Sequence, residues 1–290
     1  MMHILITGKN SYVGTSLEKW LMEESDKYRV DTIDMQIESW KNSSFAKYDV
    51  VFHVAGIAHS DMKKVSEEQK KEYYKVNTDL AIEVAKKAKE EGIKQFIFMS
   101  SAIVYGDSSP IGVSKIITEN TIPQPKNFYG DTKLKAEEGI RTLIDNNFKV
   151  CIIRSPMIYG KGSKGNYSIL SKWAVRLLIF PNIKNNRSMI YIDNLCEFIK
   201  LMIDNEEGGI FFPQNKEYVQ TADMVSIIAK VNGKQIMLTT LFNPLIKLFG
   251  KHIKVLNKVF GNLVYAKNLS KYKQEYALVD FKDSIMRTEK

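Results

Sequence analysis

Cysteine is scarce in this chain, and long apolar runs are absent. The two cysteines among 290 residues, Cys151 and Cys196, lie inside short apolar stretches and not in a spaced framework. This usage excludes a disulfide-dense scaffold and favours a reducing compartment. The first apolar run, HILIT, is too short for a signal peptide or a membrane span. We therefore expect a cytoplasmic protein.

Metal-ligand spacing and compact basic blocks are also missing. Lys and Arg number 42 against 33 Asp and Glu, so the formal net charge is +9. That excess of positive charge is compatible with binding to nucleic acid, to an anionic membrane surface or to anionic small substrates. Without zinc-ligand spacing, an RNA-binding aromatic signature or a dense Lys/Arg block, the pattern argues against nucleic acid and a metal site.

The first half of the chain alternates short apolar stretches with longer amphipathic ones, which is typical of a parallel sheet covered by helices on both faces. We expect strands at residues 3–7, 29–33, 49–56, 95–101 and 149–154, and helices at 16–24, 66–92 and 129–145. The predicted fold class is α/β, a Rossmann-type doubly wound parallel sheet with a smaller, interleaved C-terminal lobe. The boundary is expected near residue 160, with residues 186–205 packing back on the sheet.

A glycine-bearing turn, TGKNSYVG, joins the first expected strand to the first helix. Free backbone N–H groups and the helix dipole at such a junction favour a pyrophosphate. Gly8 permits the tight turn and Gly14 permits close packing of helix on strand, whereas Ser11 replaces the middle glycine of a complete fingerprint, where the backbone must approach the phosphate closely. The Ser11 hydroxyl is able to donate a hydrogen bond to phosphate. The alternative is a tight turn without a ligand.

Asp34 ends the second expected strand, 26 positions after Gly8. A carboxylate there accepts hydrogen bonds from adenosine ribose hydroxyls and repels a 2′-phosphate. The sequence therefore favours NAD(H) over NADP(H) as the cofactor, with NADP(H) left open. An ordinary strand-end cap is nearly as common an explanation of Asp34.

Tyr129 and Lys133 place a phenol and an ammonium four residues apart, on one face of a helix. By itself this spacing favours an ordinary surface pair. Ser101 closes the preceding strand at its C-terminal end, where ligands bind in open parallel sheets. A hydroxyl there can hydrogen-bond the substrate oxygen that Tyr129 protonates or deprotonates, with the Lys133 charge favouring the phenolate.

In their order along the chain, these motifs resemble the extended short-chain dehydrogenases/reductases, and within them the NAD-dependent sugar-nucleotide epimerase/dehydratase family. The matching pieces are TGKNSYVG, HVAG (53–56), YYKVN, FMSSAIVYG (98–106), FYGDTK (128–133), RSPMIYGKG (154–162) and NRSMIYIDN (186–194). They span roughly the first 195 residues. Seven ordered pieces are much more specific than any single one.

The resemblance implies an NAD(P)-binding Rossmann domain over residues 1–160 and a mainly substrate-binding lobe over 161–290. It implies the following roles: catalysis by Ser101, Tyr129 and Lys133; cofactor binding by Gly8, Ser11, Tyr12, Gly14, Asp34, Ala55, Gly56, Asn77 and Lys133; and binding of the substrate by Ser101, Asn166 and Arg187. Two of these residues have plain alternatives. In the alternative interpretation, Asn77 only forms hydrogen bonds with backbone groups, and Arg187 is a solvated charge at a strand end.

The family's 4,6-dehydratases carry an Asp-Glu pair just after the catalytic hydroxyl, where this chain has Ala102 and Ile103. Dehydration is therefore not expected. The resemblance favours reduction of a UDP-4-keto-6-deoxy-N-acetylhexosamine in surface-polysaccharide synthesis, with a UDP-sugar 4-epimerase that retains NAD as the alternative. A non-catalytic NAD-binding sensor is a third, weaker interpretation. A homodimer through the helices around 74–89 and 129–144 is an expectation from the family alone.

One segment of the C-terminal lobe, residues 244–265, is both basic and apolar at roughly helical spacing. Such a segment either lies on an anionic membrane or forms two packed helices broken at Gly250 and Gly261. We expect the packed helices, so membrane contact is disfavoured on sequence alone.

Overall fold

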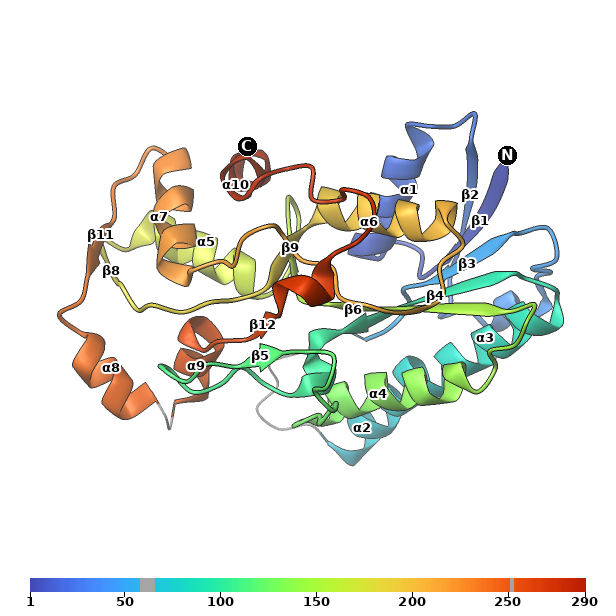
Figure 1. Cartoon of the computed structure of the whole chain (residues 1–290), viewed down its shortest axis with the longest axis horizontal. Helices are drawn as coiled ribbons and strands as arrows, with labels where there is room; N and C mark the ends of the chain where they lie inside the picture. Colours follow the sequence, from blue (N-terminus) through green and yellow to red (C-terminus); the bar gives the residue numbers. More distant parts are fainter. Residues whose placement is uncertain (58–65, 251–252) are drawn as a thin grey trace. The chain divides into compact units, whose positions relative to one another are not determined.

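The computed structural model describes residues 1–57, 66–250 and 253–290, which form two compact units (Figure 1). Unit 1 comprises Met1–Gly106, Ile122–Ser155 and Cys196–Phe212. Unit 2 comprises Asp107–Thr121, Pro156–Leu195 and Pro213–Lys290. The chain passes between the units five times, and residues 186–195 fall in unit 2 while residues 196–212 return to unit 1.

Unit 1 is built on a six-stranded parallel sheet in the order β10-β6-β4-β3-β1-β2. Its strands are β1 (Met2–Thr7), β2 (Tyr28–Ile33), β3 (Val50–His53), β4 (Gln95–Ser101), β6 (Lys149–Ser155) and β10 (Gly209–Phe211). Apolar residues fill both faces of the central strands, as a fully covered parallel sheet requires. The predicted α/β doubly wound fold is confirmed.

Helices cover both faces of this sheet (Figure 1). One face carries α1 (Tyr12–Met22) and α6 (Ile192–Asp204), and the other carries α2 (Glu67–Tyr74), α3 (Leu80–Glu90) and α4 (Phe128–Arg141). On α3 the small residues Ala81, Ala85 and Ala88 form one apolar core cluster with Phe96 and Phe98 of β4. Small side chains let the helix approach the large aromatic rings closely.

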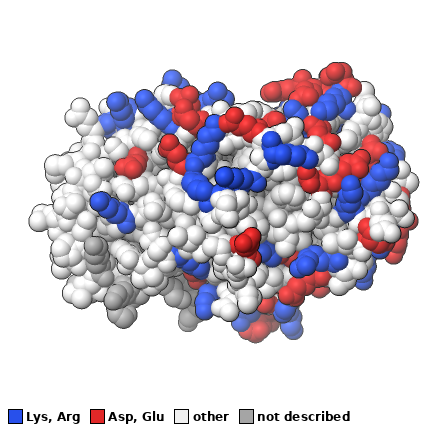
Figure 2. Space-filling view, viewed as in Figure 1, with Lys and Arg blue, Asp and Glu red and all other residues white. Residues whose placement is uncertain are grey.

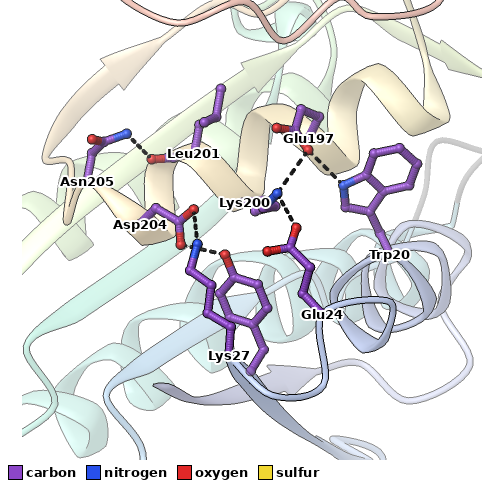
Figure 3. A network of polar contacts seen from close by, with 9 residues as sticks. Trp20, Glu24, Lys27, Glu197, Lys200, Leu201, Asp204 and Asn205 are labelled. Carbon is purple, nitrogen blue, oxygen red and sulfur yellow. Dashed lines mark hydrogen bonds and ion pairs between the residues drawn. The ribbon is translucent and has the colours of Figure 1, made fainter. Parts of the chain in front are cut away.

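Polar contacts join the second half of α6 to the first elements of the chain (Figure 3). Lys200 forms an ion pair with Glu24, and the Trp20 Nε1 donates to Glu197 at 3.0 Å. Asp204 accepts from Lys27 at 2.8 Å and from Tyr28 Oη at 2.6 Å. These contacts explain why a segment near residue 200 belongs to the same unit as α1 and β2.

Two of the predicted helices differ from the structure. Helix α1 begins at Tyr12 rather than at residue 16, because the Ser11 side chain caps it by accepting from the Gly14 N–H. The helix expected over 66–92 does start at a Ser66 capping box, but a π-helical turn at Lys75–Asp79 divides it into α2 and α3. Such turns often mark functional sites.

Unit 2 is assembled from short elements. Its strands are β5 (Ile116–Ile117), β7 (Met157–Tyr159), β8 (Ile179–Pro181), β9 (Met189–Tyr191), β11 (Met237–Thr239) and β12 (Val264–Tyr265). Its helices are α5 (Asn166–Arg176), α7 (Thr221–Val231), α8 (Asn243–Gly250), α9 (Lys254–Phe260) and α10 (Phe281–Glu289). Helix α8 ends at Gly250 and α9 ends just before Gly261, as the two glycines predict. Among the described residues, no helix has both the length and the apolar character needed to cross a bilayer.

Candidate functional site

The candidate site lies at the carboxyl ends of β1 and β3 in unit 1. After β2 pairs with one edge of β1, the chain returns to place β3 on the other edge. In a parallel sheet, this reversal of strand order leaves a crevice outside the strand ends, where ligands bind. The segments that follow β1 and β3 therefore form the walls of the site.

The turn after β1 is packed tightly against the end of β3. Gly8 has φ +104°, and a Cβ there would come within 2.9 Å of the Ala55 N and 3.0 Å of its Cα. A Cβ on Gly14 would lie 2.5 Å from the Ser11 Oγ. Gly8 is thus required by its backbone conformation and by the neighbouring backbone, whereas a side chain at Gly14 would collide with the Ser11, Ile6 and Val54 side chains. The Ser11 Oγ accepts from Gly14 at 3.2 Å, which leaves its hydrogen available to an incoming acceptor.

Asp34 follows β2 directly and is half-buried. Its Oδ1 accepts from the Gln36 N–H at 2.9 Å, which forms a local turn at the strand end. The strand-end cap is therefore present in the structure. A carboxylate has acceptor capacity beyond this one bond, so the capping role and a ribose-binding role are compatible.

The π turn brings Asn77 to the loop after β3. Its Oδ1 accepts from the Ile57 N–H at 2.7 Å, and its Nδ2 donates to the Ile57 carbonyl at 3.1 Å. The same amide reaches the Thr132 Oγ1 on α4 at 3.4 Å. A Cβ on Gly56 would meet the Asn77 Oδ1 at 3.0 Å and the Lys133 Nζ at 3.5 Å. Asn77 satisfies backbone groups, and by doing so it holds Gly56 beside Lys133.

Helix α4 is attached to the end of β4 on both sides of Ser101. The Lys133 Nζ donates to the Met99 carbonyl at 3.0 Å, two residues before Ser101. A Cβ on Gly130 would lie 2.8 Å from the Ile103 carbonyl oxygen, two residues after it. Asn127 caps the helix by accepting from the Gly130 N–H at 2.8 Å. These attachments gather Ser101, Tyr129 and Lys133 at one strand end.

Burial changes the acidity of both ionisable members of this group. Burial, together with a smaller contribution from the nearby Tyr73, raises the pKa of Tyr129 to about 12. It lowers the pKa of Lys133 to about 8, although the negative charge of Glu137 opposes that fall. At neutral pH Tyr129 is therefore a protonated phenol and Lys133 is mostly cationic. The Ser101 Oγ accepts from the Ile103 N–H at 3.3 Å, so its hydrogen can point to a substrate oxygen.

A buried ionic network, missed in the sequence, lies directly behind this group. Glu137 of α4 is 1% exposed and Arg154 of β6 is 5% exposed. The Arg154 guanidinium donates to both Glu137 oxygens, at 2.6 to 3.2 Å, and to the Tyr105 Oη at 2.5 Å. Ser100, the neighbour of Ser101, donates to Glu137. The signal that could have revealed it was Glu137 one helical turn after Lys133.

His53, the last residue of β3, is also buried near Lys133. Its Nδ1 lies 2.7 Å from the Thr7 Oγ1, and its ring stacks near Phe96 and Phe98. Burial, together with the positive charge of Lys133, lowers the pKa of His53 to about 3. The imidazole is therefore neutral at physiological pH and is not a candidate acid in place of Tyr129.

The other two substrate-binding candidates, Asn166 and Arg187, belong to unit 2. Asn166 is exposed at the first position of α5. Arg187 is half-buried, and its Nη1 donates to the Lys258 carbonyl at 2.5 Å near the end of α9. Burial lowers the pKa of Arg187 to about 10. Its charge thus stabilises the carboxyl end of a helix, and it is not the solvated strand-end charge considered as an alternative.

These residues fit a dinucleotide. The Gly8 and Gly14 cradle excludes side chains, the α1 N-terminus presents N–H groups, and Asp34 stands at the end of the adjacent strand. Gly56 lets the loop after β3 pack closely against Asn77 and the Lys133 ammonium. The sheet is doubly wound, the glycine turn follows β1, and a Tyr–Lys pair lies at the end of β4. This combination defines the class of dinucleotide-dependent oxidoreductases.

Comparison with known proteins narrows this class. Residues 4–212 match the NAD dependent epimerase/dehydratase family, to which this chain belongs. UDP-glucose 4-epimerase of Vibrio cholerae is 30% identical over 269 residues, covering 86% of this chain and 81% of that protein. N-acetyl-alpha-D-glucosaminyl-diphospho-ditrans,octacis-undecaprenol 4-epimerase of Escherichia coli O157:H7 is 26% identical over 280 residues, covering 89% and 81%.

Solved structures share the fold over nearly the whole length. UDP-glucuronic acid 4-epimerase from Bacillus cereus, in complex with NAD, has a TM-score of 0.74 at 20% identity and covers 99% of this chain and 97% of its own. A dTDP-4-dehydrorhamnose reductase from Clostridium acetobutylicum has a TM-score of 0.74 at 20% identity, covering 99% and 98%. Epimerases and reductases thus share this architecture, and the chain is an enzyme of the same family.

Proposed function

We propose that this enzyme transfers hydride at C4 of a UDP-sugar, and that its net reaction is the NADH-dependent reduction of a UDP-4-keto-6-deoxy-N-acetylhexosamine. The observation that carries the proposal is the attachment of α4 on both sides of Ser101, which sets Tyr129 and Lys133 at that strand end. No carboxylate follows Ser101, because Ala102 and Ile103 occupy those positions. This supports C4 redox chemistry without dehydration.

The protein's part in the reduction is proton delivery and alignment. Bound NADH supplies the hydride that reaches C4. The Ser101 hydroxyl donates a hydrogen bond to the C4 carbonyl oxygen and polarises it. Tyr129, protonated at neutral pH, transfers its phenolic proton to that oxygen as the alcohol forms. The cationic Lys133, one helical turn away, stabilises the phenolate that remains.

This division of roles predicts an alkaline limit to activity. Because the pKa of Lys133 is about 8, the ammonium loses its proton as the pH rises through that value. The stabilising charge is then lost, and kcat is expected to fall with an apparent pKa near 8. A pH–rate profile at saturating NADH measures this limb. A kcat that stays constant up to the ordinary lysine pKa would contradict the assigned role of Lys133.

The cofactor preference is tested at Asp34. Replacing Asp34 with Asn keeps an acceptor for the Gln36 N–H but removes the negative charge. We expect the ratio of NADPH to NADH affinity to rise about tenfold, which corresponds to about 1.4 kcal/mol. Fluorescence titration of each reduced cofactor measures the ratio. If the ratio stays at the wild-type value, Asp34 serves only as a strand-end cap.

A UDP-sugar 4-epimerase is the second candidate, and a specific observation favours it. The two curated relatives described above, which each cover more than four fifths of this chain, are both 4-epimerases. An epimerase uses the same Ser, Tyr and Lys, but Tyr129 would alternate between accepting and donating the proton while the cofactor is retained.

One experiment separates the two candidates. The purified enzyme is incubated with UDP-hexoses, with UDP-N-acetylhexosamines and with UDP-4-keto-6-deoxy-N-acetylhexosamines, each with and without added NADH. Stoichiometric oxidation of added NADH with the keto-sugars supports the reductase. Interconversion of C4 epimers without net NADH consumption supports the epimerase. Absence of both reactions would contradict the proposed C4 chemistry.

A further inference from the structure

The net charge of the protein is divided very unevenly between the two units. Unit 2 contains 20 Lys and Arg against 9 Asp and Glu, a balance of +11, whereas unit 1 contains 22 against 24, a balance of −2. The whole basic excess therefore resides in unit 2. A substrate and cofactor that each carry a diphosphate do not account for a positive charge distributed over an entire unit.

Acidic residues are absent from two long stretches that supply most of unit 2. Residues 156–192 contain six Lys and Arg and no Asp or Glu, and residues 224–274 contain nine Lys and no Asp or Glu. In an ordinary soluble surface, charges of both signs are interspersed. These stretches instead present one sign only, which attracts a polyanionic surface.

The same stretches expose large apolar side chains on the β8–β11 pair. Strand β11 pairs with β8 in parallel, with Met237 opposite Ile179. Four exposed apolar residues lie at this pair, and one of them, Leu178, is 81% exposed: Leu177, Leu178, Ile179 and Met237. On the face drawn in Figure 2, the surface over β8 and β11 carries few charged side chains. Three consecutive exposed apolar residues are unusual outside functional surfaces.

Helix α8 and the turn before it continue this apolar surface. Leu241 and Phe242 follow β11 closely, and the Asn243 Nδ2 donates to the Asn182 carbonyl just after β8. Leu241, Leu245 and Leu248 recur at helical spacing and are 76%, 57% and 66% exposed. We define the β8–α8 surface as the following exposed apolar residues: Leu177, Leu178, Ile179, Met237, Leu241, Phe242, Leu245 and Leu248. All of these residues lie in the two stretches that contain no Asp or Glu.

We propose that the β8–α8 surface docks unit 2 on an anionic lipid bilayer, with its apolar side chains entering the headgroup boundary and the surrounding Lys and Arg contacting lipid phosphates. Interfacial binding of this kind combines buried apolar area with attraction to anionic lipid. Arg176 directly precedes Leu177, and Lys234 lies three residues before Met237. Both cationic side chains are exposed at the edges of the surface.

A bilayer fits this surface better than a second copy of the chain. In a symmetric dimer the same patch would face itself. The acid-free stretches would then set lysine against lysine without a carboxylate to pair with. An anionic bilayer has the complementary charge and accepts apolar side chains. This inference concerns unit 2 alone and does not depend on which reaction the enzyme catalyses.

The test is cosedimentation of the purified full chain with vesicles of phosphatidylcholine alone or mixed with phosphatidylglycerol. The wild-type chain is expected to sediment with the mixed vesicles only, and less at high salt. The double variant Leu178→Ser/Leu245→Ser should weaken vesicle binding at least tenfold. The variants Arg176→Gln and Lys234→Gln should each weaken it about fivefold, from about 1 kcal/mol per charge near the membrane surface.

Matched controls come from unit 1, where Ile122 is 75% exposed and Lys86 is exposed. The variants Ile122→Ser and Lys86→Gln should bind vesicles as the wild-type chain does. Because every substituted side chain is exposed, circular dichroism should show unchanged folding. The proposal is overturned if the mixed vesicles fail to bind the wild-type chain, or if β8–α8 variants and controls lose binding equally. It is also overturned if light scattering shows a dimer that Leu178→Ser/Leu245→Ser dissolves while vesicles bind neither protein.

Discussion

Replacing Tyr129 with Phe is expected to lower kcat by roughly 10²- to 10⁴-fold, the range over which a positioned proton donor accelerates such reactions. The substitution removes only the Oη. The ring, which meets Tyr73 edge-to-face at 6.5 Å, keeps its packing. Because the phenol acts on the substrate oxygen, the affinity for NADH should stay within a factor of about two. Steady-state kinetics and fluorescence titration of NADH measure both quantities.

A neighbouring tyrosine supplies the matched control for this variant. Tyr74 donates its hydroxyl to Asp131 at 2.5 Å in the first turn of α4. Replacing Tyr74 with Phe removes a partly exposed hydrogen bond close to the site without touching the proposed proton donor. We expect kcat to change less than about fivefold in this variant, since the net worth of such a bond is about 1 kcal/mol or less. Full activity of the Tyr129 variant would refute the proton-donor assignment.

Replacing Glu137 with Gln is expected to have two separate effects. It removes the buried negative partner of Arg154, and breaking such a pair costs about 3 kcal/mol or more. The melting temperature should therefore fall by about 10 °C in a chain of this size. The substitution also removes the charge that raises the pKa of Lys133. The alkaline limb of the pH–rate profile should accordingly move to lower pH.

A second variant distinguishes the electrostatic effect from the structural one. Replacing Arg154 with Met in the Glu137→Gln background removes the uncompensated buried charge, so much of the lost stability should return. The shifted alkaline limb should persist, because Glu137 still lacks its charge. If the limb instead returns to the wild-type pH together with the stability, Glu137 acts on the structure alone and does not tune Lys133.

Part of the fold could be predicted because its signals are local. Apolar stretches located the five strands expected in the first half of the chain, although β3 ends at His53 and not at residue 56, and the Ser66 capping box marked the start of α2. The start of α1 was missed by four residues, because Ser11 was interpreted as a phosphate ligand and not as a helix cap. The π turn had no local signal, since it depends on bonds from Asn77 to Ile57 and Thr132.

In the candidate site, too, the local motifs could be predicted and the long-range contacts could not. Motif order indicated Ser101, Tyr129 and Lys133, but whether they share one strand end depends on contacts between α4 and β4. The role of Arg187 also depended on a distant partner, a carbonyl 71 residues later in the chain. Residues such as Asn166 carry no interaction in the described structure that assigns them a role.

The sequence by itself determined the α/β pattern, the glycine turn, and the family through the order of its motifs, because each strand, turn and motif is formed by residues close together in the chain and their order is given by the sequence. Only the tertiary structure decided which charges are buried, as in the pair of Glu137 and Arg154, and which apolar side chains stay exposed, as on the β8–α8 surface. Burial and exposure depend on contacts between distant segments. They set the pKa values at the site and the surfaces available for docking.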